Sequence, residues 1–331
     1  MNYTNILLMN YKKLKSSNFL ITGGSGFIGT NLINLLLKMK CTKIYNIDFN
    51  PPIVLSHKKY WVYCDLRNLS KLKKHIFNIK PDYIIHLAAR TDLNGKTLGE
   101  YNTNTSGTKN LIKSCINERK IVFIHASTKL VNKNGYKPSS PYDYNPDTPY
   151  GMSKVISEKF FLDKKIKFKY FIVRPTLIWG PYFSEPLYRF FSSIQKGYYF
   201  NPLLEPVYKT WGYVDNSCKQ ILHLISNHRS IKSEKIFYLG DPKPIEVFSV
   251  AKMINKSFDN KIPIIKIPKL FSFCIAIFCE IFIFLRPPLT RFKLKNISTN
   301  STYNIVLNVK NLISLKKGIK QTIKWMEKNN D

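Results

Sequence analysis

The sequence predicts an α/β protein built on a doubly wound parallel sheet, followed by a smaller, mostly helical C-terminal domain. Apolar runs of strand length alternate with amphipathic helical patterns through the first half of the chain. Uninterrupted apolar runs are typical of parallel strands buried on both faces, and strand–helix alternation favours right-handed crossovers within one sheet. The alternation ends near Arg174, beyond which proline and aromatic residues become frequent.

The length of 331 residues allows one large domain with a smaller one appended. We expect an N-terminal extension at 1–17, a nucleotide-binding domain at 18–174 and a substrate-binding domain at 175–331, with some later strands and helices returning to the first core. The extension has a short apolar patch followed by lysines, the reverse of the order in a secretory signal. We expect it to be dispensable.

Individual elements follow from the same patterns. Strands are predicted at Asn18–Thr22, Lys43–Asp48, Trp61–Tyr63, Tyr83–His86, Ile121–His125 and Lys169–Arg174. Helices are predicted at Phe27–Lys38, Leu69–Phe77, Glu100–Asn117, Tyr150–Leu162, Pro186–Gln195, Glu246–Ser257, Leu270–Leu285 and Asn311–Lys328.

Charge and cysteine content narrow the class of protein. The formal net charge is +32, but the lysines are scattered through loops and helix faces. We interpret them as a solvated surface rather than a nucleic-acid-binding one, with an anionic substrate as the next interpretation. The six cysteines form no metal-like pair, which indicates buried free thiols, no metal site and a reducing cytoplasm.

A glycine-rich segment, Thr22-Gly23-Gly24-Ser25-Gly26-Phe27-Ile28-Gly29, follows an apolar strand and opens an amphipathic helix. In this context glycines allow a tight turn and close approach of the backbone to a diphosphate, which binds at the helix N-terminus. Asp48 ends the next strand, where a carboxylate accepts hydrogen bonds from the adenosine ribose and repels a 2′-phosphate. The pair predicts a dinucleotide site that prefers NAD to NADP.

Further segments extend this pattern in order: Cys64-Asp65-Leu66, Pro81–Ala89, Asn104–Leu111 and Arg174–Pro181. With them the chain resembles the extended short-chain dehydrogenases/reductases, specifically the NAD-dependent epimerase/dehydratase family. The resemblance implies a Rossmann domain, NAD as the cofactor and a homodimer formed through the helices beside the catalytic tyrosine. It implies these cofactor-binding residues: Gly23, Ser25, Gly26, Phe27, Ile28, Gly29, Asp48, Asp65, Leu66, Leu87, Ala88, Ala89, Asn104, Tyr150, Lys154 and Thr176.

Tyr150 and Lys154 stand four residues apart and therefore share one helix face. Oxidising an alcohol requires a base for its proton, and a free tyrosine, with a pKa of about 10, keeps its own proton at neutral pH. A neighbouring ammonium and a positively charged nicotinamide both favour the phenolate. We expect Tyr150 to be the catalytic base, with its pKa lowered by Lys154.

The resemblance also implies a hydroxyl that hydrogen-bonds the reacting alcohol. It maps onto Ser127, which follows the strand ending at His125, with Thr128 as the adjacent alternative and a substrate contact. His86 and His125 lie in apolar strands, so we expect both to be hydrogen-bonded core residues rather than ligands.

The chain departs from its relatives in ways that bear on the reaction. The sugar-nucleotide 4,6-dehydratases that it resembles carry an Asp-Glu pair after the catalytic hydroxyl, where this chain has Lys129-Leu130, so dehydration is disfavoured. Leu177 replaces an asparagine that contacts phosphate in many sugar-nucleotide enzymes. Lys209 stands where an arginine is commoner, and a cation there suits an anionic substrate.

Leu270–Leu285 is almost wholly apolar and has basic residues on both sides. It is shorter than the ~20 residues that span a bilayer. It is interpreted as a core helix of the smaller domain or as a helix lying in a membrane interface. A similar segment occurs in the hydroxysteroid-dehydrogenase branch, which keeps a lipid substrate and a location at the inner membrane surface open. The flanking residues are Lys266, Lys269, Arg286 and Arg291.

These observations favour an enzyme that oxidises a secondary alcohol of a nucleotide sugar with NAD, in the manner of a 4-epimerase for surface polysaccharide synthesis. The first alternative is a membrane-associated 3β-hydroxysteroid-dehydrogenase-like oxidoreductase. The second, from another class, is a non-catalytic NAD-binding sensor, which the Tyr-Lys-Ser set argues against.

Overall fold

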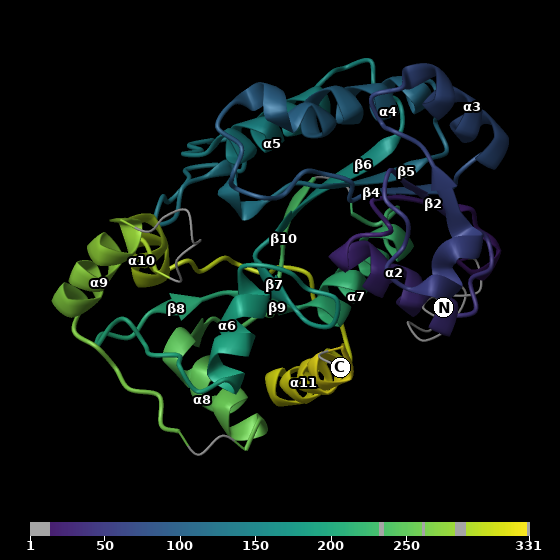
Figure 1. The fold of residues 1–331 in the computed structure, drawn as a ribbon. Helices are drawn as coiled ribbons and strands as arrows, with labels where there is room; N and C mark the ends of the chain where they lie inside the picture. Colours follow the sequence, from purple (N-terminus) through teal and green to yellow (C-terminus); the bar gives the residue numbers. More distant parts are fainter. Residues whose placement is uncertain (1–13, 232–234, 260–261, 282–288, 330–331) are drawn as a thin grey trace.

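The computed structural model describes residues 14–231, 235–259, 262–281 and 289–329, and a seven-stranded parallel sheet forms the centre of its larger domain (Figure 1). The strand order is β10-β6-β5-β4-β1-β2-β3. Strand order therefore reverses at β1, which pairs with β2 on one side and β4 on the other. The strands are β1 (Phe19–Thr22), β2 (Ile44–Asp48), β3 (Trp61–Tyr63), β4 (Tyr83–His86), β5 (Val122–Ala126), β6 (Lys169–Pro175) and β10 (Ile236–Leu239).

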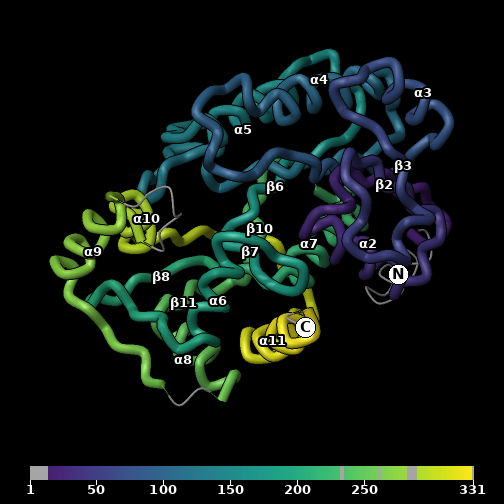
Figure 2. The backbone as a smooth tube through the Cα atoms, viewed as in Figure 1, coloured from purple at the N-terminus to yellow at the C-terminus, as the bar shows by residue number. Residues whose placement is uncertain are grey.

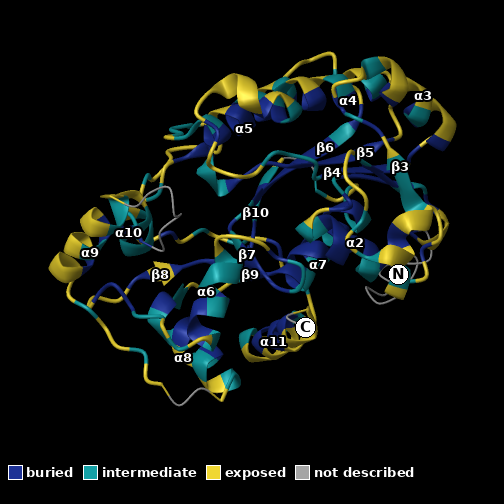
Figure 3. Ribbon diagram, in the orientation of Figure 1, coloured by how far each residue is buried: buried dark blue, intermediate teal, exposed yellow. Residues whose placement is uncertain are grey.

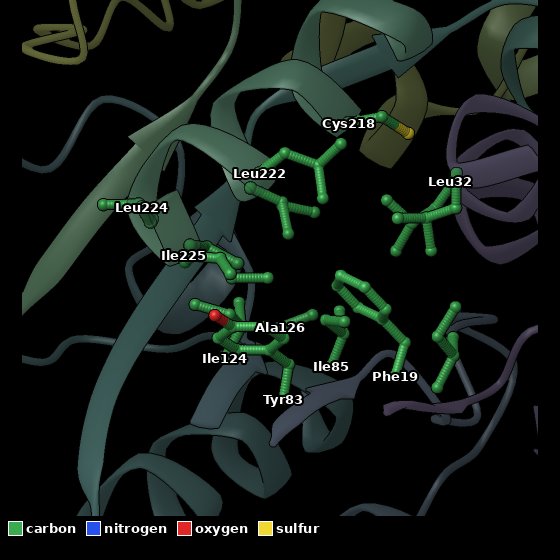
Figure 4. Packing of buried hydrophobic residues seen from close by; sticks show 14 of the residues in the cluster. Phe19, Leu32, Tyr83, Ile85, Ile124, Ala126, Cys218, Leu222, Leu224 and Ile225 are labelled. Carbon is green, nitrogen blue, oxygen red and sulfur yellow. The ribbon is translucent and has the colours of Figure 1, made fainter. Parts of the chain in front are cut away.

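Helices cover both faces of this sheet, as the sequence predicts. One face is covered by α2 (Phe27–Lys38) and α7 (Val214–Ser226), and the other by α3 (Leu69–Ile79), α4 (Thr108–Cys115) and α5 (Pro149–Phe160) (Figure 1). Apolar side chains from α2, α7 and the central strands form the first core, part of which Figure 4 shows. The doubly wound parallel sheet is confirmed.

The predicted helix at Glu100–Asn117 is broken into three pieces. A 3₁₀ turn (Leu98–Tyr101) and a π-helical turn (Thr103–Gly107) precede α4. The Thr103–Gly107 segment is rich in residues of low helix propensity, and the Thr108 hydroxyl donates to the Asn104 carbonyl at 2.7 Å. The π turn lets Asn104 point toward the loop after β4.

Two elements beyond Arg174 belong to the sheet domain but were not predicted as individual segments. Strand β10 pairs with β6, and α7 packs against α2 and the sheet. Both lie among loops and short strands. In such a region the apolar runs are too short for their periodicity to distinguish a helix from a strand.

The smaller domain lies below the sheet domain in the view of Figure 2. It has its own core, which is rich in aromatic side chains. Its helices are α6 (Leu187–Gln195), α8 (Val247–Ser257), α9 (Lys269–Ile281), α10 (Arg291–Ser298) and α11 (Leu315–Asn329). Two short ribbons complete it: β7 (Leu177–Trp179) with β9 (Trp211–Tyr213), and β8 (Tyr208–Lys209) with β11 (Ile245–Glu246). The end of the predicted helix Leu270–Leu285 lies outside the described residues, and no helix in the described ranges has the length and apolarity needed to cross a bilayer.

The cysteines are less uniform than expected. Cys41, Cys64, Cys115 and Cys218 are buried free thiols, but Cys274 is exposed and Cys279 is partly exposed, both on α9. The expectation of burial is wrong for these two, because α9 turns much of its apolar surface outward.

The last residues of the predicted N-terminal extension contribute to the core, so the expectation that the extension is dispensable does not hold for Leu14. Residues 1–13 lie outside the described residues, but Leu14 is only 1% exposed and belongs to the first core. Its carbonyl accepts a hydrogen bond from the Cys41 thiol.

We predict that Leu14→Ala lowers the free energy of unfolding by about 2–5 kcal/mol, because it removes a buried side chain and leaves a cavity. Urea unfolding followed by circular dichroism measures the change. Leu55→Ala is the matched control, since Leu55 is 81% exposed and should change stability by less than about 0.5 kcal/mol. Equal stability of the two variants would mean that the Leu14 side chain does not stabilise the core.

Candidate active site

A cleft of about 630 Å³ opens at the carboxyl ends of the parallel strands. It lies where strand order reverses, the usual position of ligand sites in doubly wound sheets. Nearly all of the predicted site residues line it: Gly23, Ser25, Gly26, Phe27, Ile28, Gly29, Asp48, Asp65, Leu66, Leu87, Ala88, Ala89, Ser127, Thr128, Tyr150, Lys154 and Thr176.

The glycine turn brings backbone into close contact at one end of the cleft. Gly23 has a φ of +75°, and a Cβ placed there would lie 2.5 Å from the amide nitrogen of Ala88. A Cβ on Gly29 would lie 2.3 Å from the Gly23 carbonyl oxygen. Helix α2 begins at Phe27 with no side chain capping it and no acidic residue in its first turn. Its amide groups and helix dipole therefore fit a diphosphate.

Asp48 lies beside this turn at the end of β2. Its carboxylate accepts hydrogen bonds from the backbone amides of Ser25 at 3.1 Å and Asn50 at 3.0 Å. Burial raises the pKa of Asp48, and these hydrogen bonds oppose the rise. An oriented carboxyl group at this edge of the cleft fits the adenosine ribose of NAD.

Tyr150 and Lys154 face the cleft from α5, which begins at Pro149 after the Thr148 cap. Both are almost fully buried, at 7% and 2% exposure. Burial raises the pKa of Tyr150 to about 12, against the lowering effect of a hydrogen bond with the Thr128 side chain. Burial also lowers the pKa of Lys154 to about 8, and its Nζ donates to the Ala126 carbonyl at 2.7 Å. The expected lowering of the Tyr150 pKa by Lys154 is therefore not seen, because desolvation dominates.

The two candidate hydroxyls after β5 point to different partners. The Ser127 hydroxyl donates to the Glu158 carboxylate in the interior. The Thr128 hydroxyl interacts with Tyr150 and also accepts a hydrogen bond from the Leu130 amide at 3.2 Å. Of the two hydroxyls, that of Thr128, the alternative from the sequence, is therefore the one in contact with Tyr150.

Glu158 is the main residue that sequence reasoning missed. Its carboxylate is fully buried and pairs with the Arg174 guanidinium at 2.7 and 2.9 Å, while Tyr144 donates to it at 3.0 Å. It also raises the pKa of Lys154. A signal was present, since Glu158 follows Lys154 by one helical turn and Tyr150 by two on the same face.

Asn104 supports the site from behind the cleft rather than lining it. Its side chain accepts from the Arg90 amide and donates to the Arg90 carbonyl, at 2.8 and 2.9 Å, and it also donates to the Ser153 hydroxyl. Asn104 thereby fixes the loop after β4 to α5. His86 and His125 are buried and hydrogen-bonded to hydroxyls, which confirms them as core residues.

Lys209, predicted to contact substrate, does not reach the cleft. Its Nζ donates to the carbonyls of Asn296 at 2.8 Å and Thr299 at 2.5 Å. Burial, with a smaller effect of nearby Lys129, lowers its pKa to about 7. The segment that leads out of α10 covers Lys209, a long-range contact that a single motif does not reveal.

Comparison with known proteins agrees with this geometry. The model of the NAD-dependent epimerase/dehydratase family matches residues 19–240, more than half of the chain. A 3-beta-hydroxysteroid dehydrogenase of Mycolicibacterium neoaurum is 26% identical, covering 75% of this chain and 72% of its own length. An Escherichia coli O157:H7 enzyme, N-acetyl-alpha-D-glucosaminyl-diphospho-ditrans,octacis-undecaprenol 4-epimerase, is 24% identical, covering 76% of each.

A solved structure shares the fold over nearly the whole chain. The UDP-glucose 4-epimerase of Thermotoga maritima, crystallised with UDP-glucose, superposes with a TM-score of 0.71. It covers 95% of this chain and 100% of its own, at 18% identity.

We predict that Asp48→Ala weakens NAD binding and reduces the difference in affinity between NAD and NADP. The variant loses the acceptor for the ribose hydroxyls and the charge that repels a 2′-phosphate. Calorimetric titration with both cofactors measures this. Asp82→Ala removes a carboxylate just before β4, at the opposite end of the sheet from the cleft, and is the control for a lost charge. Tighter binding of NADP than of NAD by the unaltered protein would contradict the assignment.

We predict that Glu158→Gln lowers the pKa of Lys154 further, because the carboxylate that raises it is gone. The Lys154 ammonium is present below its pKa and lost as pH rises through it, so NAD affinity should fall at a lower pH than in the unaltered protein. Calorimetry across a pH series measures the shift, with circular dichroism to verify folding. Glu118→Gln, an exposed site, is the control. Coincident pH profiles would show that Glu158 has no such effect.

Proposed function

This chain belongs to the NAD-dependent epimerase/dehydratase family, and from that membership we propose that it oxidises a secondary alcohol of a nucleotide-linked sugar, most simply in a 4-epimerisation for surface polysaccharide synthesis. The observation that carries the proposal is the convergence of Tyr150, Lys154 and Thr128 on a cleft that also holds the glycine turn and Asp48. One end therefore suits a dinucleotide and the other suits proton transfer.

Each group in the catalytic set has a distinct task. Tyr150 accepts the proton of the substrate hydroxyl, and Thr128, in place of Ser127, hydrogen-bonds the same oxygen. Lys154, one helical turn from Tyr150, is the cation available to favour the phenolate against the desolvation that raises the Tyr150 pKa, and it would hold the nicotinamide ribose. Bound NAD would supply the acceptor for the hydride that leaves the carbinol carbon. In an epimerisation the keto sugar turns over in the cleft and recovers the hydride on its other face.

The loop after Thr128 argues against elimination of water. Lys129 donates to Asn134 at 3.1 Å and Ser301 at 3.0 Å, and Leu130 carries no ionisable group. Neither can serve as the carboxylate pair that removes a C5 proton and protonates a leaving hydroxyl. The reaction thus ends at oxidation, reduction or epimerisation.

A hydroxysteroid or other hydroxylated lipid is the second candidate substrate. The Mycolicibacterium neoaurum relative acts on 3-beta-hydroxysteroids according to its name, and helix α9 exposes large apolar side chains. A non-catalytic NAD sensor would not require Tyr150, Lys154 and Thr128 to line the same cleft, so their arrangement argues against that alternative.

We predict that incubation with NAD and a panel of nucleotide sugars yields an isomer of one of them, with little net NADH, because an epimerase returns its hydride. Product chromatography and absorbance of the reduced cofactor are followed together. No 4-keto-6-deoxy product should form. Steroid turnover without sugar turnover would replace this proposal with the second candidate, and stoichiometric NADH with a stable ketone would indicate a plain dehydrogenase.

We predict that Tyr150→Phe abolishes turnover and leaves NAD binding intact, because it removes the proton acceptor and keeps the ring. Thr128→Ala should lower kcat by about 10²–10⁴. Ser127→Ala should lower it by less than about tenfold, since the Ser127 hydroxyl donates to Glu158 and not into the cleft. The reverse order of the two hydroxyl variants would restore Ser127 to the catalytic role.

A further inference from the structure

In helix α9 the large apolar side chains face outward, whereas in a core helix they would be buried. It buries the small side chains of Ser272 and Ala276, and Figure 3 shows most of the helix exposed. The large apolar side chains recur at helical spacing on the opposite side. They include Leu270, Phe271, Phe273, Ile277, Phe278 and Ile281, which are 43% to 71% exposed.

Helix α9 is held against the rest of the protein through its buried face. The Ser272 hydroxyl donates to the Pro202 carbonyl at 2.8 Å, and the buried Ala276 packs with Leu289 and Leu294 in a small core. The helix is therefore held with its large apolar side chains outward. A contiguous exposed apolar patch on a folded protein marks an interaction surface.

The charged residues around this face are mostly basic. Lys269 opens the helix and is exposed, and Lys295 is exposed on neighbouring α10. Glu280 is the single acidic residue in the described part of α9 and α10, and Arg291 neutralises it at 2.7 Å. Basic groups beside an apolar helical face are the pattern of a helix lying in the interface of an anionic membrane.

We propose that the exposed face of α9 docks on the surface of an anionic lipid bilayer, with the helix in the plane of the interface. Its length of 13 residues suits lying in the interface and not crossing it. A second copy of this chain is a poorer occupant, since a two-fold interface on this face would bring Lys269 and Lys295 of both copies together.

The position of α10 connects the docking surface to the cleft. Asn134, in the loop after Thr128, donates to Asn296 of α10 at 2.9 Å. Lys293 of α10 lies near Glu185, which lines the cleft: burial lowers the pKa of Lys293, and the Glu185 carboxylate opposes that lowering. Docking would place this end of the cleft next to the lipid surface. The proposal concerns binding alone and does not depend on the substrate.

Sedimentation with vesicles tests the proposal. The full chain should bind vesicles of phosphatidylcholine mixed with phosphatidylglycerol, bind phosphatidylcholine alone more weakly, and release partly in high salt through screening. Phe271→Ser/Phe278→Ser should lower the partition coefficient by about tenfold or more, because two exposed rings no longer enter the interface. Lys269→Gln/Lys295→Gln should remove most of the preference for the anionic lipid.

A matched control is Leu55→Ser/Phe77→Ser, which removes side chains that are 81% and 75% exposed on the sheet domain. It should bind within about twofold of the unaltered protein. Absence of vesicle binding, or equal losses in the two apolar variants, would overturn the proposal. So would sedimentation velocity that finds a dimer which only the α9 variant dissociates, because a second copy would then cover the helix.

Discussion

A carboxylate removed from water loses several kcal/mol of hydration, and the interior tolerates it only where an opposite charge and hydrogen bonds replace that hydration. Glu158 receives both, from Arg174 on β6, Tyr144 in the loop before α5 and Ser127 after β5. These donors are far apart in the sequence, so satisfying one carboxylate fixes α5 against two strands. Because α5 also carries Tyr150, the buried ion pair determines the position of the proposed base.

Burial affects the two ionisable residues of the catalytic set in opposite directions. It raises the pKa of Tyr150 and lowers that of Lys154, so each resists its charged form. His86 and His125 lie nearby, and burial lowers their pKa as well, which keeps them neutral. Ionisation of the phenol therefore depends on positive charge close to it. Glu158 favours that charge by raising the pKa of Lys154.

The sequence was most informative where function or packing imposes a local pattern. The glycine turn and Asp48 could be placed because backbone contact and ribose binding require particular residues at particular distances. The choice between Ser127 and Thr128 could not be made, since successive residues point in different directions and only the fold shows that Glu158 lies behind one of them. The position of Lys209 could not be predicted for a similar reason, because its hydrogen-bond partners come from residues about 90 positions later.

The pairing of β10 with β6 has a consequence for the order in which the protein forms during synthesis. Strand β6 ends at Pro175, but its neighbour emerges only with Ile236–Leu239, and α7 must also emerge to cover the first core. Until then a nascent chain presents an unpaired strand edge and uncovered apolar side chains, both of which promote aggregation. The residues proposed to bind NAD are all synthesised by Thr176, yet the sheet that holds them is completed only some sixty residues later.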